Sequence, residues 1–85
     1  MSYRVVWTPS AQNDLATAWI NAGDQAAVTQ ASHRLERDLA RSPLSVGESR
    51  RSSVERVAFL PPLAITFLVV MDDHTVFVTA VTLTG

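Results

Sequence analysis

The pattern of apolar and polar positions changes from a strand period to a helix period and back again along the chain. The run YRVVW at 3–7 favours a strand. Two segments then repeat their apolar residues at helical spacing and predict helices over 9–21 and 25–41. Their apolar stripes consist of Ala11, Leu15, Ala18 and Trp19 in the first helix, and of Val28, Ala31, Leu35 and Leu39 in the second.

Residues at the ends of both helices agree with these limits. Thr8 is a good N-cap, and Pro9 occupies the first helical position, where the missing N–H of proline costs little. The segment 21–23, which ends in a glycine, terminates the first helix. Asp24 is placed to cap the second.

The stretch VAFLPPLAITFLVVM at 57–71 contains one polar side chain, Thr66. A membrane-spanning helix needs about 20 apolar residues, and the residue before a proline avoids helical geometry, so Pro61-Pro62 argues against one helix. The β-branched and aromatic residues on both sides suit a sheet. Together with the turn sequence DDHT at 72–75, the pattern predicts strands over 54–60, 63–71 and 74–83.

The resulting order is β-α-α-β-β-β in one domain, 1–85, with a loop over 42–53. Helices followed by consecutive strands indicate the α+β class, with two helices packed on one face of a small, mostly antiparallel sheet. The strands 63–71 and 74–83 are apolar on both sides of their alternation and are expected at the centre.

Composition narrows the chemistry. The 85 residues include no cysteine, and the two histidines lie far apart, so we expect no disulfide, no metal site and no cofactor. No signal peptide or membrane anchor is expected, which favours a cytoplasmic protein without membrane contact. With a net charge of -1, the whole molecule does not attract nucleic acid. All seven basic residues are arginine, which suits bidentate recognition of phosphate or carboxylate but also follows from a coding bias.

Three pieces of the sequence together resemble the RelE/ParE superfamily of bacterial type II toxin–antitoxin toxins. They are the opening YRVVWTPSAQNDLATAW with its Ala-x-x-Asp-Leu pattern at 11–15, the long second helix ending in Ser42-Pro43, and the hairpin FLVVMDDHTVFVTAV. The resemblance covers nearly the whole chain. It implies a bacterial cytoplasmic toxin whose partner is an antitoxin that wraps it with an amphipathic helix or an extended segment.

The resemblance also implies two possible targets. One branch of the family cleaves mRNA on the ribosome without a metal, and another inhibits DNA gyrase. The nucleases need cations for the charge that develops on phosphate and an acid and a base for proton transfer. Aligned on the acidic turn, the position of one family arginine falls on Ile65, and another basic position falls at or near Gly85. Arg56 is the one sheet position that matches a basic position of the family. Because the other positions lack their basic residues, the catalytic set is incomplete.

The residues offer their own candidates for target binding. Arg50 and Arg51 form a basic cluster, and Arg56 follows on the adjoining predicted strand, so the three are candidates to hold RNA phosphate. The alternative is a solvated loop in which these arginines pair with Glu48 and Glu55. Arg56 and His74 are the candidate catalytic residues, His74 because of the neighbouring Asp72 and Asp73.

A second group of candidates lies on the helices and is expected at an antitoxin interface: Trp19, Arg34, Arg37 and Arg41. The alternative for Trp19, as for Trp7, is packing in the core. The alternative for the arginines is a solvated helix face with an Arg34–Asp38 pair, which is worth only about 0.3–0.5 kcal/mol.

Four hypotheses follow. The chain is a toxin neutralised by a cognate antitoxin, a ribosome-dependent mRNA endoribonuclease that uses Arg50, Arg51 or Arg56, a DNA gyrase inhibitor, or a non-toxic decayed homologue that acts only as an interaction module. Because edge strands of a small apolar sheet tend to be covered, a homodimer is a further possible association.

Overall fold

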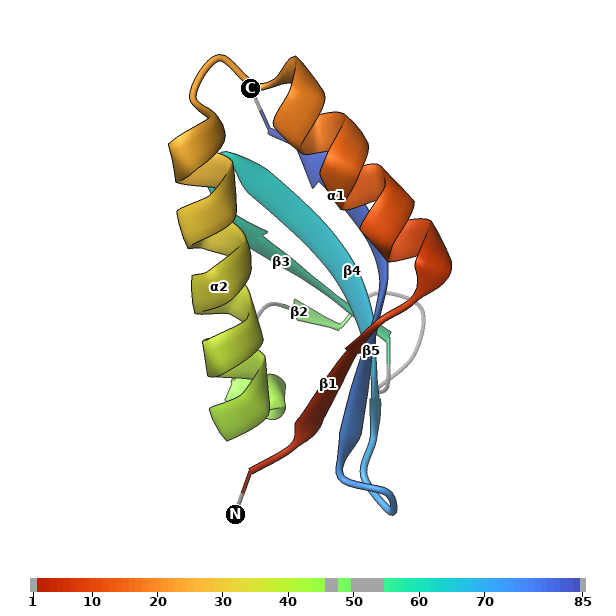
Figure 1. Ribbon diagram of the computed structural model, residues 1–85. Helices are drawn as coiled ribbons and strands as arrows, with labels where there is room; N and C mark the ends of the chain where they lie inside the picture. Colours follow the sequence, from red (N-terminus) through yellow and green to blue (C-terminus); the bar gives the residue numbers. More distant parts are fainter. Residues whose placement is uncertain (1, 46–47, 50–54, 85) are drawn as a thin grey trace.

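The computed structural model describes residues 2–45, 48–49 and 55–84. One sheet carries two helices, α1 (Pro9–Asn21) and α2 (Gln25–Arg41), on the same face (Figure 1). The strands are β1 (Arg4–Trp7), β2 (Glu48–Ser49), β3 (Glu55–Leu60), β4 (Leu63–Val70) and β5 (Thr75–Leu83). The predicted α+β class, element order and helix limits are confirmed.

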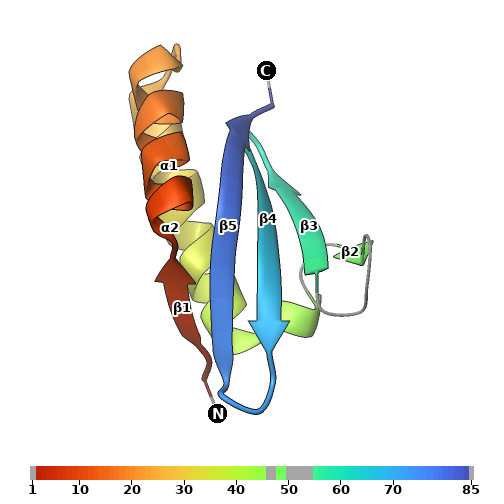
Figure 2. The same cartoon turned by 90° about the vertical axis from the view of Figure 1, so that its right-hand side faces the viewer.

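The sheet has the strand order β1-β5-β4-β3-β2, in which β1 pairs parallel with β5 and the other pairs are antiparallel (Figure 2). The two most apolar strands, β4 and β5, are central, as their pattern predicts. The edges belong to the four-residue β1 and the two-residue β2. Strand β4 therefore has a strand on both sides, whereas β1 pairs with β5 only as far as Val78. A homodimer stays a prediction.

Both helices begin with the caps that the sequence predicts. The Thr8 hydroxyl accepts the Ala11 N–H at 3.2 Å, and the Asp24 carboxylate accepts the Ala27 N–H at 3.1 Å. Thr8 also donates its hydroxyl to the carbonyl oxygen of Val78 at 2.9 Å. Since a cap satisfies helix donors that have no intrahelical partner, Thr8 both starts α1 and joins it to the sheet.

The core lies between the helices and the face of the sheet beneath them. Its largest fully buried side chain is Phe67 of β4, which is 0% exposed. The predicted faces of both helices supply Ala11, Ala18, Val28, Ala31, Leu35 and Leu39. Leu15 is half-buried, but Trp19 is 44% exposed, so the expectation that Trp19 packs in the core is wrong. Ala18 takes the core position, and the next residue points about 100° away from it.

A β-bulge in β5 sets which residues face this core. Thr66 pairs with Ala80 and the next residue, Phe67, pairs with Val78, so Thr79 has no counterpart on β4. The Thr79 hydroxyl donates to the Thr66 carbonyl oxygen at 3.2 Å. Because the bulge changes the parity of the strand, Val78 and Val81 share the face under the helices although three positions separate them.

Two connections add detail to the predicted loops. The segment 42–53 contains a short 3₁₀ helix, Pro43–Ser45, and the strand β2, so its assignment as loop throughout is wrong. Composition indicates a turn but not the two backbone pairs that β2 forms with β3. The Pro61-Pro62 turn, with a cis peptide bond, joins β3 and β4 as predicted.

Candidate functional site: an apolar groove between the helices

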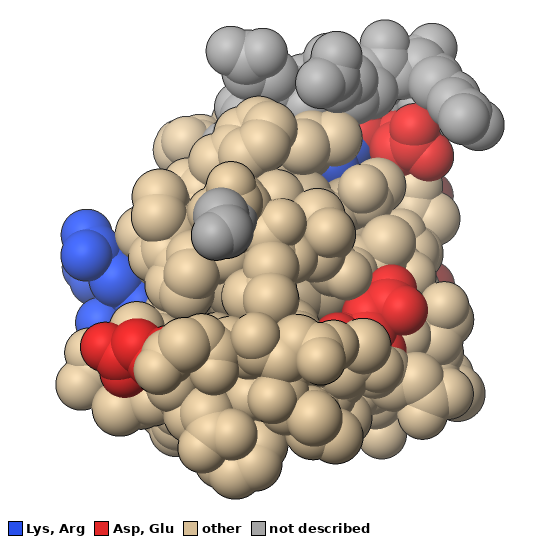
Figure 3. All heavy atoms as spheres, turned by 90° about the horizontal axis from the view of Figure 1, so that it is seen from above, with Lys and Arg blue, Asp and Glu red and all other residues tan. Residues whose placement is uncertain are grey.

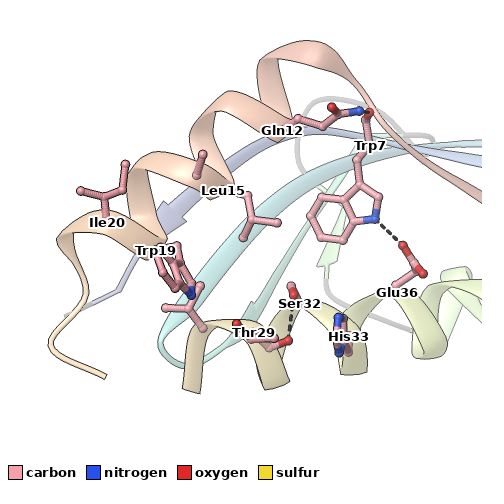
Figure 4. A pocket seen from close by; sticks show the side chains of 11 residues that line it. Trp7, Gln12, Leu15, Trp19, Ile20, Thr29, Ser32, His33 and Glu36 are labelled. Atoms are coloured by element: carbon pink, nitrogen blue, oxygen red, sulfur yellow. Dashed lines mark hydrogen bonds between the residues drawn. The ribbon is translucent and has the colours of Figure 1, made fainter. Parts of the chain in front are cut away.

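An open groove of about 680 Å³ runs between α1 and α2 (Figure 4). Strand β1 and α1 line it with Trp7, Gln12, Leu15, Ala16, Trp19 and Ile20, and α2 lines it with Val28, Thr29, Ser32, His33 and Glu36. Trp19 and Ile20 are 44% and 68% exposed. Because soluble monomers rarely expose neighbouring large apolar side chains, the groove is the best candidate for an interaction site in the described part of the chain.

One end of the groove is held by polar contacts of Trp7. Its indole Nε1 donates to Oε1 of Glu36 at 2.7 Å, and its carbonyl oxygen accepts from Nε2 of Gln12 at 2.8 Å. Figure 4 shows the indole reaching from β1 toward α2, with Glu36 at its tip. The bond to Glu36 orients the indole, and the two bonds together connect β1, α1 and α2 at the same place.

The arginines of α2 lie outside the groove. Arg34, Arg37 and Arg41 are exposed, and none of them lines it. Figure 3 shows basic side chains on the flank of the molecule where α2 lies. The predicted Arg34–Asp38 pair is present at 4.0 Å, and with both side chains solvent-exposed it contributes little. Of the four candidates for an antitoxin interface, the structure places only Trp19 in the groove.

Of the three candidates for target binding, the described residues include only Arg56. Arg50 and Arg51 lie outside them. Arg56 is half-buried on β3, opposite Phe67, and paired residues of neighbouring strands point to the same face. Arg56 therefore projects from the face that carries the helices. Its catalytic or RNA-binding role stays a prediction.

His74 has a backbone role at the tip of the β4–β5 hairpin. It adopts the left-handed conformation with φ 49°, and its carbonyl oxygen accepts the Arg4 N–H at 2.8 Å. Its ring lies 5.1 Å from that of Tyr3, centroid to centroid. These contacts join the hairpin to the start of β1. An acid–base role for His74 stays a prediction.

The position that the family resemblance assigns to an arginine belongs to the core. Ile65 is 1% exposed and pairs with Ala58 and Val81 on the helix side of the sheet. The described residues include no group of three histidine, aspartate or glutamate side chains suited to hold a metal ion. No helix among them is long and apolar enough to cross a membrane.

The opposite face of the sheet carries a second, shallower hollow of about 250 Å³. Phe59, which is 66% exposed, lines it together with Val57, Ala64 and Thr66. Neither helix covers this face (Figure 2). Sequence reasoning missed it because both sides of the central strands are apolar, and the pattern does not say which side receives the helices.

Sequence reasoning also missed Ile20, Trp7 and Glu36 as parts of the groove. The sequence does contain a signal for Ile20. It is a large apolar residue next to Trp19 that lies outside the apolar stripe expected to face the core. No local signal exists for Trp7 and Glu36, because 29 positions separate them.

No protein-family model matches the sequence, and no curated protein is significantly similar to it. Solved structures do match. The RelBE2 toxin–antitoxin complex from Mycobacterium tuberculosis matches with a TM-score of 0.79 and 23% identity, over 98% of this chain and 99% of the other.

Two further structures agree. The chromosomal ParDE toxin–antitoxin system from P. aeruginosa matches with a TM-score of 0.71 and 15% identity, over 98% and 97% of the chains. The isolated E. coli RelE toxin matches with a TM-score of 0.70 and 16% identity, over 98% of this chain and 85% of the other. The chain therefore has the fold of the RelE and ParE toxins, as the sequence resemblance predicts.

Proposed function

We propose that this chain is the toxin of a type II toxin–antitoxin system and is neutralised by binding a cognate antitoxin. The observation that carries the proposal is the match to RelE and ParE structures over nearly the whole length of both chains. Two of these structures are toxin–antitoxin complexes, which supports an antitoxin as the partner.

The groove supports the same function. Trp19 and Ile20 expose apolar surface that a partner would cover, and aromatic residues in concave sites dominate many protein interfaces. We assign the antitoxin contact to this groove rather than to the arginine flank of α2, because exposed ion pairs contribute little.

The residues support a toxin that acts by binding its target and that lacks the complete set of catalytic residues of the family's nucleases. The buried Ile65 stands where the resemblance places an arginine, and Arg56 projects from the helix side of the sheet. The candidate targets are the ribosome with its mRNA and DNA gyrase.

Controlled expression of the chain alone in a bacterial culture tests the proposal. We expect growth arrest, and recovery when the neighbouring reading frame is expressed with it. Intact transcripts together with impaired supercoiling would indicate gyrase, and cleaved transcripts would indicate an endoribonuclease. Undisturbed growth with folded protein, and no partner that co-purifies, would contradict the proposal in favour of a non-toxic homologue.

A further inference from the structure

The face of the sheet that points away from both helices is apolar. Successive side chains of a strand point to opposite faces, so each strand that contributes to the core also presents residues on this side. Neither helix covers it (Figure 2). Strands β1, β3, β4 and β5 place six large apolar residues on this open face, of which Phe59 is 66% exposed and the others are half-buried: Val6, Val57, Phe59, Leu68, Val70 and Phe77. Contiguous apolar surface of this kind marks an interaction site.

The charged residues of the open face lie at its two margins and have opposite signs. Among the residues that β1, β3, β4 and β5 place on this face, only Arg4 and Glu55 are charged. Arg4 belongs to β1 and Glu55 to β3, the outer two of these four strands. Glu55 already interacts within its own chain, but a carboxylate has lone pairs for several donors. The open face therefore has a basic margin and an acidic margin, with apolar residues between them.

This arrangement is complementary to itself. The register places Val6, Phe77, Leu68 and Glu55 in one row across the sheet. A two-fold axis parallel to the strands, between Phe77 and Leu68, lays each of these two side chains over the other in a second copy. The same axis lays the basic margin of each copy over the acidic margin of the other. Arg4 is two residues from Val6, about 7 Å along β1, so its long side chain reaches the level of Glu55.

The area of the open face suffices for a dimer. Four strands about 4.8 Å apart are about 19 Å wide, and the nine residues of β5 extend for about 30 Å. Two copies that overlap fully would therefore bury a footprint of about 1,100 Å² in total, close to the lower limit of specific interfaces. Two sheets that pack face to face lie about 10 Å apart with their strands nearly aligned, a geometry that a parallel two-fold axis provides.

We propose that two copies of this chain associate through their open faces, with Phe77 of each copy on Leu68 of the other and Arg4 of each beside Glu55 of the other. A two-fold axis perpendicular to the strands would bring margins of like charge together, so the charges favour the parallel axis. The groove between α1 and α2 faces away from this interface in each copy, so the dimer leaves it open. The inference goes beyond the proposed function, which requires no dimer.

Sedimentation equilibrium of the full chain without antitoxin measures the association. We expect a monomer–dimer equilibrium with a dissociation constant of about 1–100 μM at low salt, as an interface near the lower size limit allows. Leu68→Glu places a carboxylate at the centre of the interface and should leave a monomer. Trp19→Ala, in the groove on the other side of the molecule, is the matched control and should leave the dissociation constant unchanged. Circular dichroism verifies that every variant is folded.

Charge reversal tests the orientation and does not depend on whether Leu68→Glu folds. Arg4→Glu produces a chain with two acidic margins, and Glu55→Arg produces a chain with two basic margins. Each variant alone should dimerise at least about tenfold more weakly than the parent chain at low salt, because like charges then meet. An equimolar mixture of the two variants should associate as tightly as the parent chain, since every acidic margin again faces a basic one.

A chain that stays monomeric up to about 0.5 mM, or a folded Leu68→Glu variant that still dimerises, would overturn the inference. A mixture of the charge variants that associates no better than either alone, or a dimer that Trp19→Ala abolishes, would overturn it as well. A monomeric chain that loses its antitoxin through Leu68→Glu would assign the open face to the antitoxin instead. Growth arrest by a monomeric chain would keep the proposed function and remove only the dimer.

Discussion

The carboxylate of Asp14 accepts a hydrogen bond from the backbone N–H of Val81, with 3.2 Å between Oδ2 and N. Strand β1 ends at Trp7, opposite Val78, so the part of β5 that follows has no strand on that side among the described residues. Helix α1 lies there, and Asp14 satisfies a donor that would otherwise pair with a neighbouring strand. In the Ala-x-x-Asp-Leu pattern at 11–15, Ala11 packs in the core, Asp14 binds the edge of the sheet and Leu15 lines the groove.

Replacing Asp14 by alanine should destabilise the fold. The Val81 N–H is partly buried, and leaving such a donor without its acceptor costs about 1–3 kcal/mol. Asp14→Asn should cost less, because its amide oxygen still accepts. Urea unfolding monitored by circular dichroism measures both. The exposed variant Asp72→Ala is the control, and its free energy of unfolding should change by about 0.5 kcal/mol or less.

A pair of phenylalanines tests the assignment of the core. Phe67 is fully buried and Phe59 is 66% exposed, on opposite faces of the sheet. Phe67→Ala should lower the free energy of unfolding by about 3–5 kcal/mol, enough to unfold many domains of this size. Phe59→Ala should cost far less, as measured in the same urea titration. Similar losses in both variants would mean that the open face is packed as tightly as the core.

The hydrogen bond between Trp7 and Glu36 should be measurable as a coupling. Trp7→Phe keeps an aromatic ring but removes the Nε1 donor, and we expect a loss of about 0.5–1.5 kcal/mol in unfolding free energy. Glu36→Ala should cost a similar amount, and the double variant should cost less than the sum of the two. Full additivity in this double-mutant cycle would show that the contact contributes nothing to stability.

Trp19 and Ile20 should matter for neutralisation and not for folding. Trp19→Ala at an interface centre typically costs about 2 kcal/mol or more of binding free energy, which weakens the complex about 30-fold. Ile20→Asp places a charge on the same apolar surface and should act in the same direction. Cells that express either variant with the antitoxin should arrest, as an antitoxin-deficient culture does.

Phe59→Ala is the matched control for these groove variants, because Phe59 is about as exposed as Ile20 but lies on the other face. Cells that carry Phe59→Ala with the antitoxin should grow normally. Arrest with Phe59→Ala and growth with Trp19→Ala would move the antitoxin contact to the open face of the sheet.

Arg56→Ala and His74→Ala test the proposed absence of nuclease chemistry. Growth arrest by either variant should match that of the parent chain, since neither residue is assigned to the site. The same assay extends to Arg50→Ala and Arg51→Ala. The endoribonuclease hypothesis would be supported instead if the parent chain caused cleavage of cellular transcripts and any of these variants remained folded but lost its toxicity.

The sequence by itself determined the two helices and the four longer strands, but not the short 3₁₀ helix and β2. Thr8 and Asp24 predict where the two helices begin, and both act as N-caps there. Pro61-Pro62 separates two strands. These features depend on hydrogen bonds and dihedral preferences within a few residues, so local pattern contains them. The same pattern also placed β4 and β5 at the centre of the sheet, because strands that are apolar on both sides need neighbours.

Only the tertiary structure decided the site. The pairs Trp7–Glu36 and Asp14–Val81 join residues 29 and 67 positions apart. The bulge at Thr79 changes which side of β5 faces the helices. The exposure of Trp19 also depends on tertiary packing, because a residue on a helix is buried or exposed according to what lies against it. Contacts between distant elements depend on how those elements pack, and no spacing along the chain records that.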